Sequence, residues 1–438
     1  MTVSIGKVIL GQTLTFTEDP SIVGAGASFD YYEKGAIAVS SEGKILWHGD
    51  AASLPSLYHS LPRRDFGTKL ILPGFIDAHL HYPQYRMLAA FGKDLLDWLN
   101  RYTFVEEQNY SNVRHATLAA KTFLDELLRN GITSALAFST IHPLALNAVF
   151  SEAAGRNMAL ISGKTMMDRN APALLCDTAD SSYDDSKALI RKWHGEGRLR
   201  YAISPRFAVT SSEAQLELAG ALVKEHPDLL MQTHLSENRG EIDFVANDFP
   251  WSTDYTDVYD RFGLLGPRSF FAHGVHLSER ELGRLSESGS AIVHCPTSNN
   301  FLGSGLFRYH HTRAKTRPVK VGIGCDIGGG TSYCMLQTLG DAYKVSQLSG
   351  DRISAFDGFY LATLGNARLL GLDNEIGSMQ VGRFADLVVL DAEATPIMKA
   401  RHVLSKDLHD ILFALMIMGD DRAISQTFVA GNEVKPVS

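Results

Sequence analysis

Between about residues 70 and 370 the chain alternates short apolar runs with longer segments that have helical spacing. The short runs are rich in branched side chains and have the length of buried strands. They cover 70–79, 132–138, 157–165, 200–207, 229–236, 269–275, 291–295 and 319–326. The segments between them predict helices at 111–129, 144–155, 184–195, 212–225, 240–262, 278–288 and 331–348, with a last helix at about 354–371. Because such alternation implies parallel strands joined by helical crossovers, eight units predict an α/β fold, a (β/α)8 TIM-like barrel.

The two ends of the chain differ from this middle region because they are rich in strand-like segments. Strand-like segments there are 8–16, 35–40, 44–50, 377–391 and 427–434. Neither end alone has many strands. We therefore expect residues 1–70 and 377–438 to form one small flanking β-sandwich domain beside a barrel of residues 71–376. A single barrel with decorated ends is the alternative.

Composition excludes several classes of protein. Hydrophobic residues make up 45% and charged residues 21% of the chain, as in globular proteins with a sizeable core. No apolar run is long enough to cross a membrane, and the first residues lack a secretory pattern. The net charge of −8, with scattered basic residues, disfavours a nucleic-acid partner. Four cysteines without a Cys-x-x-Cys pair predict reduced thiols. We expect a cytoplasmic protein that binds neither nucleic acid nor membrane.

Residues 70–85, LILPGFIDAHLHYPQY, contain the first candidate metal ligands. Side chains alternate along a strand, so His79 and His81 point the same way and can bind one cation. In a chain with 16 histidines a single His-x-His pair is a weak signal. The interpretation therefore depends on whether other strands also end in metal-binding side chains.

Active sites of such barrels lie at the C-terminal ends of the strands. There the sequence places Arg206, His234, His273 and Asp326, and Glu237 follows His234 by three residues. A lone histidine in such a place is more often structural. Histidines at three strand ends and an aspartate at a fourth favour a metal site instead.

The predicted metal ligands are His79, His81, His234 and Asp326. Imidazole and carboxylate are ligands of catalytic zinc, which keeps an open position for water and lowers the pKa of that water to about 7. We predict one Zn²⁺ per subunit, although iron accepts the same ligands. Glu237 lies beyond its strand end and is predicted to carry protons rather than bind metal. His273, if it is not a ligand, would stabilise developing negative charge.

A dinuclear hydrolase is the near alternative. In such enzymes a carboxylated lysine at the end of the fourth strand bridges two metals. Here the fourth strand ends in Arg206, which stays protonated, and Lys164 falls on the third strand. One metal is therefore preferred.

Together these blocks resemble the amidohydrolase superfamily over nearly the whole chain. The matching blocks are PGFIDAHLHYPQY (73–85), THLSE (233–237), FAHGVHLS (271–278), HCPTSNNFLGSGLF (294–307), GIGCDIGGGTS (322–332) and ADLVVLD (385–391). The metal-site blocks look like those of the mononuclear zinc deaminase branch. Two more, DLLDWLNRYTF (94–104) and ISPRFAVTSS (203–212), resemble the members that act on guanine. The first departs from the family pattern, which has a proline where this chain has Val105.

The resemblance implies the substrate contacts. The implied substrate-binding residues are Gln84, Trp98, Leu99, Arg206, Phe207 and His273. In the family the arginine binds the purine 6-oxo group, the glutamine hydrogen-bonds the ring, and the apolar residues line it. A guanidinium suits a carbonyl oxygen and would be left unpaired against adenine's amino group, so Arg206 should select 6-oxopurines.

The implied activity is zinc-dependent hydrolytic deamination of guanine to xanthine and ammonia. The implied catalytic residues are Glu237, which moves the water's proton to N3, and His273 and Asp326, which stabilise the attacking hydroxide and the tetrahedral intermediate. The resemblance also implies a homodimer. Two alternatives stay open: a related deaminase acting on a pterin, 8-oxoguanine or a triazine, and a catalytically inactive barrel that serves as a binding or scaffold protein.

Overall fold

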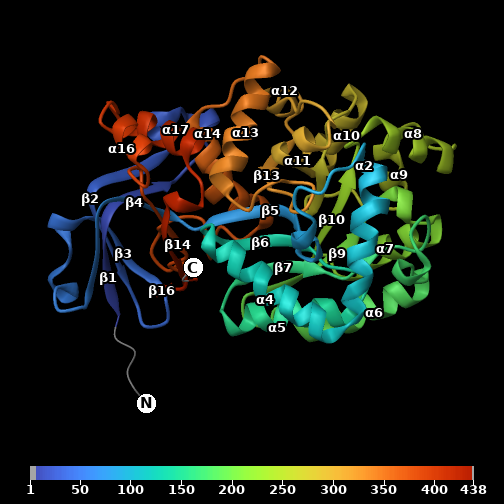
Figure 1. Cartoon of the computed structure of the whole chain (residues 1–438), viewed down its shortest axis with the longest axis horizontal. Coiled ribbons are helices and arrows are strands. Elements are labelled where there is room, and N and C mark those ends of the chain that lie inside the picture. The colour runs from blue at the N-terminus through green and yellow to red at the C-terminus, as the bar shows by residue number, and fades with distance from the viewer. Residues whose placement is uncertain (1–5, 437–438) are drawn as a thin grey trace.

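The computed structural model describes residues 6–436, which form two sheets with helices around them (Figure 1). The larger sheet is the predicted barrel, to the right in Figure 1. Its strands, in hydrogen-bonded order, are β5 (Phe75–His81), β6 (Ile132–Phe138), β7 (Ala159–Gly163), β9 (Leu199–Pro205), β10 (Leu230–Leu235), β11 (Ser269–His273), β12 (Ala291–His294) and β13 (Lys320–Ile323). A short strand β8 (Thr165–Met166) also pairs with β9. All pairs are parallel, which confirms the predicted fold class.

The ring closes between β5 and the segment that follows β13. The amide of Asp326 donates to the carbonyl of His79 at 2.9 Å, and the amide of His81 donates to the carbonyl of Ile327 at 2.6 Å. These bonds fix the first and last strand ends of the barrel against each other. The predicted ligands on the two strands are therefore neighbours because of backbone pairing.

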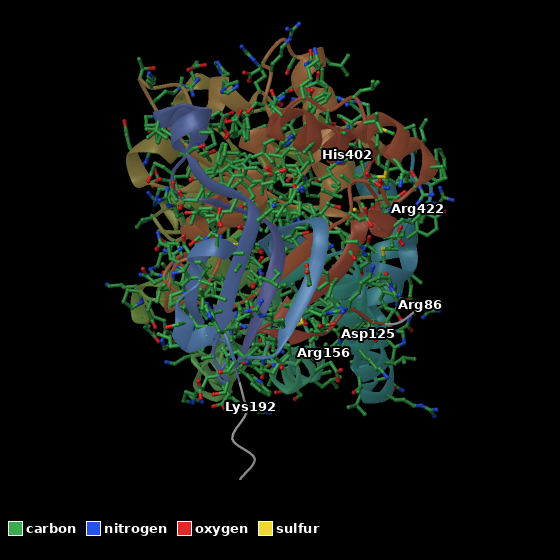
Figure 2. All side chains as sticks on the ribbon, turned by 90° about the vertical axis from the view of Figure 1, so that its left-hand side faces the viewer. Arg86, Asp125, Arg156, Lys192, His402 and Arg422 are labelled. Atoms are coloured by element: carbon green, nitrogen blue, oxygen red, sulfur yellow. The ribbon has the colours of Figure 1, made fainter. Side chains whose placement is uncertain are left out.

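Helices return the chain between the strands, as predicted. The crossover helices are α4 (Val113–Arg129), α5 (Pro143–Gly155), α6 (Ala179–Trp193), α7 (Glu213–Glu225), α8 (Arg239–Asp248), α9 (Tyr255–Arg261), α10 (Glu279–Ser288) and α13 (Met335–Leu348). Helix α10 begins with a capping box between Ser278 and Glu281. Neighbouring helices are joined by ion pairs such as Arg156 to Asp125 at 2.6 Å, both labelled in Figure 2.

Three predicted elements have different limits in the structure. The single helix at 240–262 is two helices, because Pro250 disfavours helical backbone at the preceding residue, where α8 ends. The helix at 354–371 is α14 (Ala355–Tyr360), a π-helical turn over Leu361–Gly365 and α15 (Asn366–Leu370).

The predicted strand at 70–79 is split at Gly74: β4 (Arg63–Pro73) joins the second sheet and β5 begins the barrel. A side chain at Gly74 would come within 2.3 Å of Thr133 Oγ1, so only glycine fits this crossing.

Both chain ends build the second sheet, as expected. Its hydrogen-bonded order is β16 (Asn432–Glu433), β15 (Ile424–Val429), β14 (Leu387–Leu390), β4, β1 (Lys7–Phe16), β2 (Phe29–Val39) and β3 (Ile45–Asp50). The antiparallel pair of β4 and β14 joins the N-terminal strands to the C-terminal ones. Figure 2 shows the N-terminal strands of this sheet facing the viewer. The domain limits at 70 and 377 stay a prediction, and residues 1–5 and 437–438 lie outside the described part.

Two helices between β14 and β15 were not predicted, namely α16 (Pro396–His402) and α17 (Leu408–Met418). The second, LHDILFALMIM, is apolar along most of its length and contacts α13 and α14. Among residues 6–436 no helix is both long and apolar enough to cross a bilayer. All four cysteines are free, as predicted.

A long connection between β5 and β6 reaches over the mouth of the barrel. It contains a 3₁₀ segment (Tyr82–Met87), α2 (Leu95–Trp98), a π-helical turn (Leu99–Thr103) and α3 (Phe104–Glu107). Short helices also follow other strands: α11 (Pro296–Phe301) comes after β12, and α12 (Tyr309–Thr312) precedes β13. These connections, rather than the strands, supply much of the cavity wall described below.

Candidate active site

The predicted ligands meet at the C-terminal mouth of the barrel. His79 and His81 lie on the same side of β5, with their Nε2 atoms 3.2 and 3.3 Å from Oδ1 of Asp326. His234, the penultimate residue of β10, has its Nε2 3.1 Å from that of His81. The four side chains are buried, between 2% and 8% exposed. The structure thus brings together all four residues that the sequence selected from three parts of the chain.

His273 belongs to the same cluster. Ligand atoms of His79, His234, His273 and Asp326 all lie within 4.8 Å of one another. His273 ends β11, and its Nε2 is 3.7 Å from Oδ2 of Asp326 and 3.4 Å from Oε2 of Glu237. It therefore stands between the predicted ligand carboxylate and the predicted proton carrier.

The rings of His234 and His273 are each oriented by a contact through Nδ1, the nitrogen that faces away from the cluster. Nδ1 of His234 is 2.7 Å from the backbone oxygen of Arg206, and Nδ1 of His273 is 2.9 Å from Oδ1 of Asn299 on α11. Because an oxygen acceptor requires a hydrogen on Nδ1, both rings present an unprotonated Nε2 to the cluster when neutral. This is the tautomer in which a histidine binds metal through Nε2.

Charges in the cluster suit a cation. Burial lowers the pKa of His81 to about 3, and burial together with the neighbouring histidines lowers the pKa of His234 well below its usual value. Burial alone would raise the pKa of Asp326, but contacts with His79 and His81 lower it well below its usual value. Neutral imidazoles beside an ionised carboxylate are the forms that coordinate a metal ion.

Glu237 lies two residues beyond β10 and is 2% exposed. Its Oε1 accepts a hydrogen bond from the hydroxyl of Ser304 at 3.2 Å. Burial, with the nearby charge of Asp326, raises the pKa of Glu237 to about 8. A carboxyl group with a pKa near neutrality can both accept and release a proton at physiological pH.

A cavity with about 380 Å³ of empty space, part of it open to solvent, lies beside the cluster. All six predicted substrate residues line it: Gln84, Trp98, Leu99, Arg206, Phe207 and His273. Leu95, Leu302 and Gly329, which were not predicted to touch substrate, line it too. The predicted proton carrier and the predicted substrate contacts thus share one compartment.

The apolar part of this wall comes mostly from the β5–β6 connection. Trp98 and Leu99 are 3% and 5% exposed, and Phe207, which follows β9, is 3% exposed. The ring of Phe207 lies 6.3 Å from that of His234. A flat aromatic ligand would find apolar faces here and polar groups only at particular points of its edge.

The polar part of the wall depends on a buried carboxylate that the sequence did not single out. Glu107, the last residue of α3, is fully buried, and both of its oxygens accept from Nη1 of Arg206 at 3.0 Å. Nε2 of Gln84 donates to Oε1 of Glu107 at 2.9 Å. The side-chain oxygen of Gln84 accepts from the amide of Gly328 at 3.1 Å. The two polar side chains predicted to bind substrate are thus held in one network.

The three glycines after β13 allow close approach of the backbone. A side chain at Gly328 would come within 2.6 Å of the carbonyl oxygen of Gln84, and one at Gly330 within 1.8 Å of that of Cys325. At Gly329 it would come within 2.6 Å of the hydroxyl of Ser298. The triplet therefore packs backbone against the cluster.

The two side chains on which the dinuclear alternative depends, Lys164 and Arg206, both form ion pairs with other residues. The ammonium group of Lys164 contacts the carboxylate of Asp177 and lies 3.3 Å from the hydroxyl of Ser182. The guanidinium of Arg206 is paired with Glu107. Neither side chain can act as a bridging carboxylated lysine in this arrangement.

Sequence reasoning missed three residues of this site: Glu107, Asn299 and Ser304. Each acts on a predicted residue rather than lining the cluster itself. Asn299 belongs to the polar run PTSNN after β12, and α11 gives this run a role through the contact of Asn299 with His273. Nothing in the sequence distinguishes Glu107 from the neighbouring Glu106, which is paired at the periphery with Arg86 and His115.

The fold and the cluster together define a class of protein. Four imidazoles and a carboxylate at the C-terminal mouth of a (β/α)8 barrel, with a buried glutamate beside them, are typical of metal-dependent hydrolases.

Comparison with known proteins specifies the class further. A sequence model described as the Amidohydrolase family matches residues 70–434. The chain belongs to the amidohydrolase family.

Several relatives carry a more specific name. A guanine deaminase of Escherichia coli (strain K12) is 47% identical over 435 residues, which are 98% of this chain and 97% of the relative. The crystal structure of guanine deaminase from Bradyrhizobium japonicum is similar with a TM-score of 0.95 at 36% identity, covering 99% of this chain and 100% of that one. Guanine deaminase from C. acetobutylicum, solved with guanine in its active site, has a TM-score of 0.87 at 30% identity and covers 98% and 100%.

Proposed function

We propose that this chain is a guanine deaminase, which hydrolyses guanine to xanthine and ammonia with the help of one divalent metal ion. The observation that carries the proposal is the shared cavity, which is lined by Arg206 and Gln84, by apolar side chains such as Trp98, and by Glu237 and three histidines of the cluster. Relatives with this name that align over nearly the full length of the chain support it.

The proposed metal is zinc, and its proposed ligands are His79, His81, His234 and Asp326. Nε2 of His79 is buried and makes no hydrogen bond within residues 6–436, although it lies 3.2 Å from Asp326. Burying such an atom costs free energy unless a partner such as a cation occupies its lone pair. When bound, the metal would allow water to ionise near pH 7. His273 is farther from Asp326 than the two β5 histidines are, which favours a hydrogen-bonding role for it.

Glu237 is the proposed proton carrier. In the proposed reaction it takes a proton from the attacking water and delivers it to N3 of guanine, which makes C2 more electrophilic. The hydroxyl of Ser304 holds one of its oxygens, and Nε2 of His273 lies 3.4 Å from the other. The remaining hydroxide bonds to C2 and gives a tetrahedral intermediate. Glu237 then carries the proton of the new C2 hydroxyl to the 2-amino group, the C2–N bond breaks, and ammonia and xanthine result.

The substrate ring is held from its opposite edge. Arg206 offers hydrogen-bond donors to the 6-oxo group, and Gln84 binds an adjacent ring atom. Trp98, Leu99 and Phe207 pack against the faces of the ring and exclude bulk water. This arrangement directs the 2-amino group toward Glu237 and His273.

A substrate panel tests the proposal. The purified protein, with its metal content measured on the same sample, is incubated with guanine, adenine, cytosine, 8-oxoguanine and a pterin while ammonia is recorded. We expect guanine to be turned over far faster than the others, and Glu237→Gln to keep its metal but lose about 10²–10⁴-fold in kcat. Turnover of another ring with guanine inert would leave only the family assignment.

Two further expectations belong to this proposal. The chain is expected to act as a homodimer, which light scattering on the purified protein checks, and in the cytoplasm, which cell fractionation checks. A monomer in solution would contradict the first expectation without affecting the catalytic scheme.

A further inference from the structure

We infer that Glu107 is a positioning residue that fixes which atoms of Gln84 and Arg206 face the substrate. It thereby selects rings whose far edge carries hydrogen-bond acceptors. The inference rests on the proposed deaminase function and concerns the polar part of the cavity wall formed by Gln84 and Arg206.

Glu107 has the burial and contacts that such a role requires. Its carboxylate is fully buried and accepts three hydrogen bonds, two from Nη1 of Arg206 at 3.0 Å and one from Nε2 of Gln84 at 2.9 Å. An ionised carboxylate only accepts hydrogen bonds. Both partners must therefore direct a donor toward it.

The orientation of the Gln84 amide follows from its two protein partners. Its nitrogen faces the Glu107 carboxylate, and its oxygen accepts from the amide of Gly328 at 3.1 Å. Turning the amide over would place an oxygen against a carboxylate and a nitrogen against a backbone N–H. Since both ends would then be mismatched, the amide is locked, and its second N–H remains available to the cavity.

Arg206 is fixed by the same carboxylate. The pair is buried on both sides, with the two side chains 3% and 0% exposed, and the guanidinium also lies 5.6 Å from the ring of Phe104. Glu107 neutralises a cation that would otherwise be buried without a counter-charge. The remaining guanidinium donors are thus held in place for a carbonyl oxygen, and the polar edge of the cavity donates rather than accepts.

Glu107→Gln should disrupt this network although it changes only one group. A glutamine whose oxygen takes the place of Oε1 still accepts from both Gln84 and Arg206, but its amide nitrogen then faces the donor Nη1 of Arg206, and the counter-charge of Arg206 is lost. Exchanging the two groups in Q84E/E107Q restores most of these bonds. The new glutamine accepts one hydrogen bond from Nη1 of Arg206 and donates to the new glutamate, which also accepts from the amide of Gly328. The exchanged pair keeps the contacts among positions 84, 107 and 328 and keeps one buried negative charge, but it loses one of the two bonds from Arg206 and presents an acceptor to the substrate.

The experiment compares wild type, E107Q, Q84E/E107Q and the control E106Q as metal-loaded, purified enzymes. E106Q makes the same chemical change one residue away, at a side chain paired with Arg86 and His115 outside the cavity. Steady-state kinetics with guanine give kcat and KM. Inhibition constants are measured for hypoxanthine and for unsubstituted purine, which differ at the 6-oxo group. Because neither is deaminated at C2, the ratio of the two constants reports how the enzyme recognises the 6-oxo group. Thermal midpoint and metal content are measured on each sample.

For wild type and E106Q we expect hypoxanthine to bind at least about tenfold more tightly than purine, the usual effect of one charge-assisted hydrogen bond. For E107Q the ratio should fall to near one and kcat/KM for guanine should fall about 10²-fold, mostly through KM. Q84E/E107Q should recover the thermal midpoint but not the guanine activity. This combination separates positioning from folding, even if E107Q alone does not fold.

Three results would overturn the inference. They are a hypoxanthine-to-purine ratio near one in wild type, a folded E107Q that keeps both this ratio and its guanine activity, and a recovery of guanine activity in the exchanged double variant. A wild-type enzyme that leaves guanine unchanged would refute the proposed function instead, and the inhibitor ratio would still test Glu107.

Discussion

The buried ion pair between Arg198 and Asp386 links the barrel to the second sheet, and we predict that Asp386→Ala strongly destabilises the chain. The guanidinium of Arg198 binds both oxygens of Asp386, one of them at 3.2 Å, and the two side chains are only 5% and 1% exposed. The carboxylate also accepts from the amide of Ala430 at 2.8 Å. The backbone oxygen of Asp386 accepts from Gly74, where β4 passes into β5.

The size of the effect follows from what the substitution leaves behind. Removing one partner of a buried pair leaves an uncompensated charge and costs about 3–5 kcal/mol. An unfolding entropy of about 2.1 cal/mol/K per residue gives roughly 0.9 kcal/mol/K for 438 residues. The thermal midpoint should therefore fall by about 3–5 °C.

Differential scanning calorimetry at one scan rate measures this shift. The matched control is Glu433→Ala, which removes an arginine partner from the exposed pair with Arg64 and should cost less than about 1 kcal/mol. Replacing both members, as in R198M/D386L, should recover most of the stability because no buried charge remains. The reasoning fails if Asp386→Ala melts within 1 °C of the Glu433→Ala variant, a margin of about 1 kcal/mol.

Two further predictions concern catalysis and pH. Asn299→Ala removes the acceptor that fixes the ring of His273, so kcat/KM for guanine should fall about 10–100-fold while the thermal midpoint changes little; unchanged kinetics would show that the ring needs no such support. His48 hydrogen-bonds Thr13 in the second sheet, and burial lowers its pKa to about 4. Because the unfolded chain binds this proton near pH 6.5, stability should decline as the pH falls from 6.5 toward 4, by about 3 kcal/mol from this group. His48→Gln should remove that part of the decline in urea titrations at pH 7 and pH 4.5, and an identical decline in the variant would exclude His48 as its source.

The barrel and its histidine cluster could be predicted because both follow from local pattern. Strand β6 occupies the residues that the apolar run marked, and the other barrel strands differ from their predicted limits by a few residues. Parallel strands in a closed barrel bring their C-terminal ends to one mouth. A histidine or aspartate at a strand end therefore has a predictable position even when its partner is 153 residues away, as for His81 and His234.

The supporting residues could not be predicted because their positions depend on packing between connections. Glu106 and Glu107 are adjacent and chemically alike, yet one pairs with Arg86 near the surface and the other is buried beneath Arg206. Both lie on α3, which directly follows a π-helical turn over Leu99–Thr103. The hydrophobic periodicity of the sequence does not predict this turn, so it does not predict which glutamate faces inward. The split at Gly74 was missed for a similar reason, since one continuous apolar run serves two different sheets.

The site therefore has one part built from strand ends and one part built from connections, and substitutions should affect the two parts differently. The proposed metal ligands are held by backbone closure of the barrel, since the amide of Asp326 bonds to the carbonyl of His79. The proposed polar substrate contacts are held by side chains of a long connection, chiefly Glu107 against Arg206. Substitutions in residues 82–107 can therefore change which ring is accepted without disturbing the cluster. Substitutions at the strand ends remove the cluster for every substrate, so new specificities on this barrel should arise through the connection.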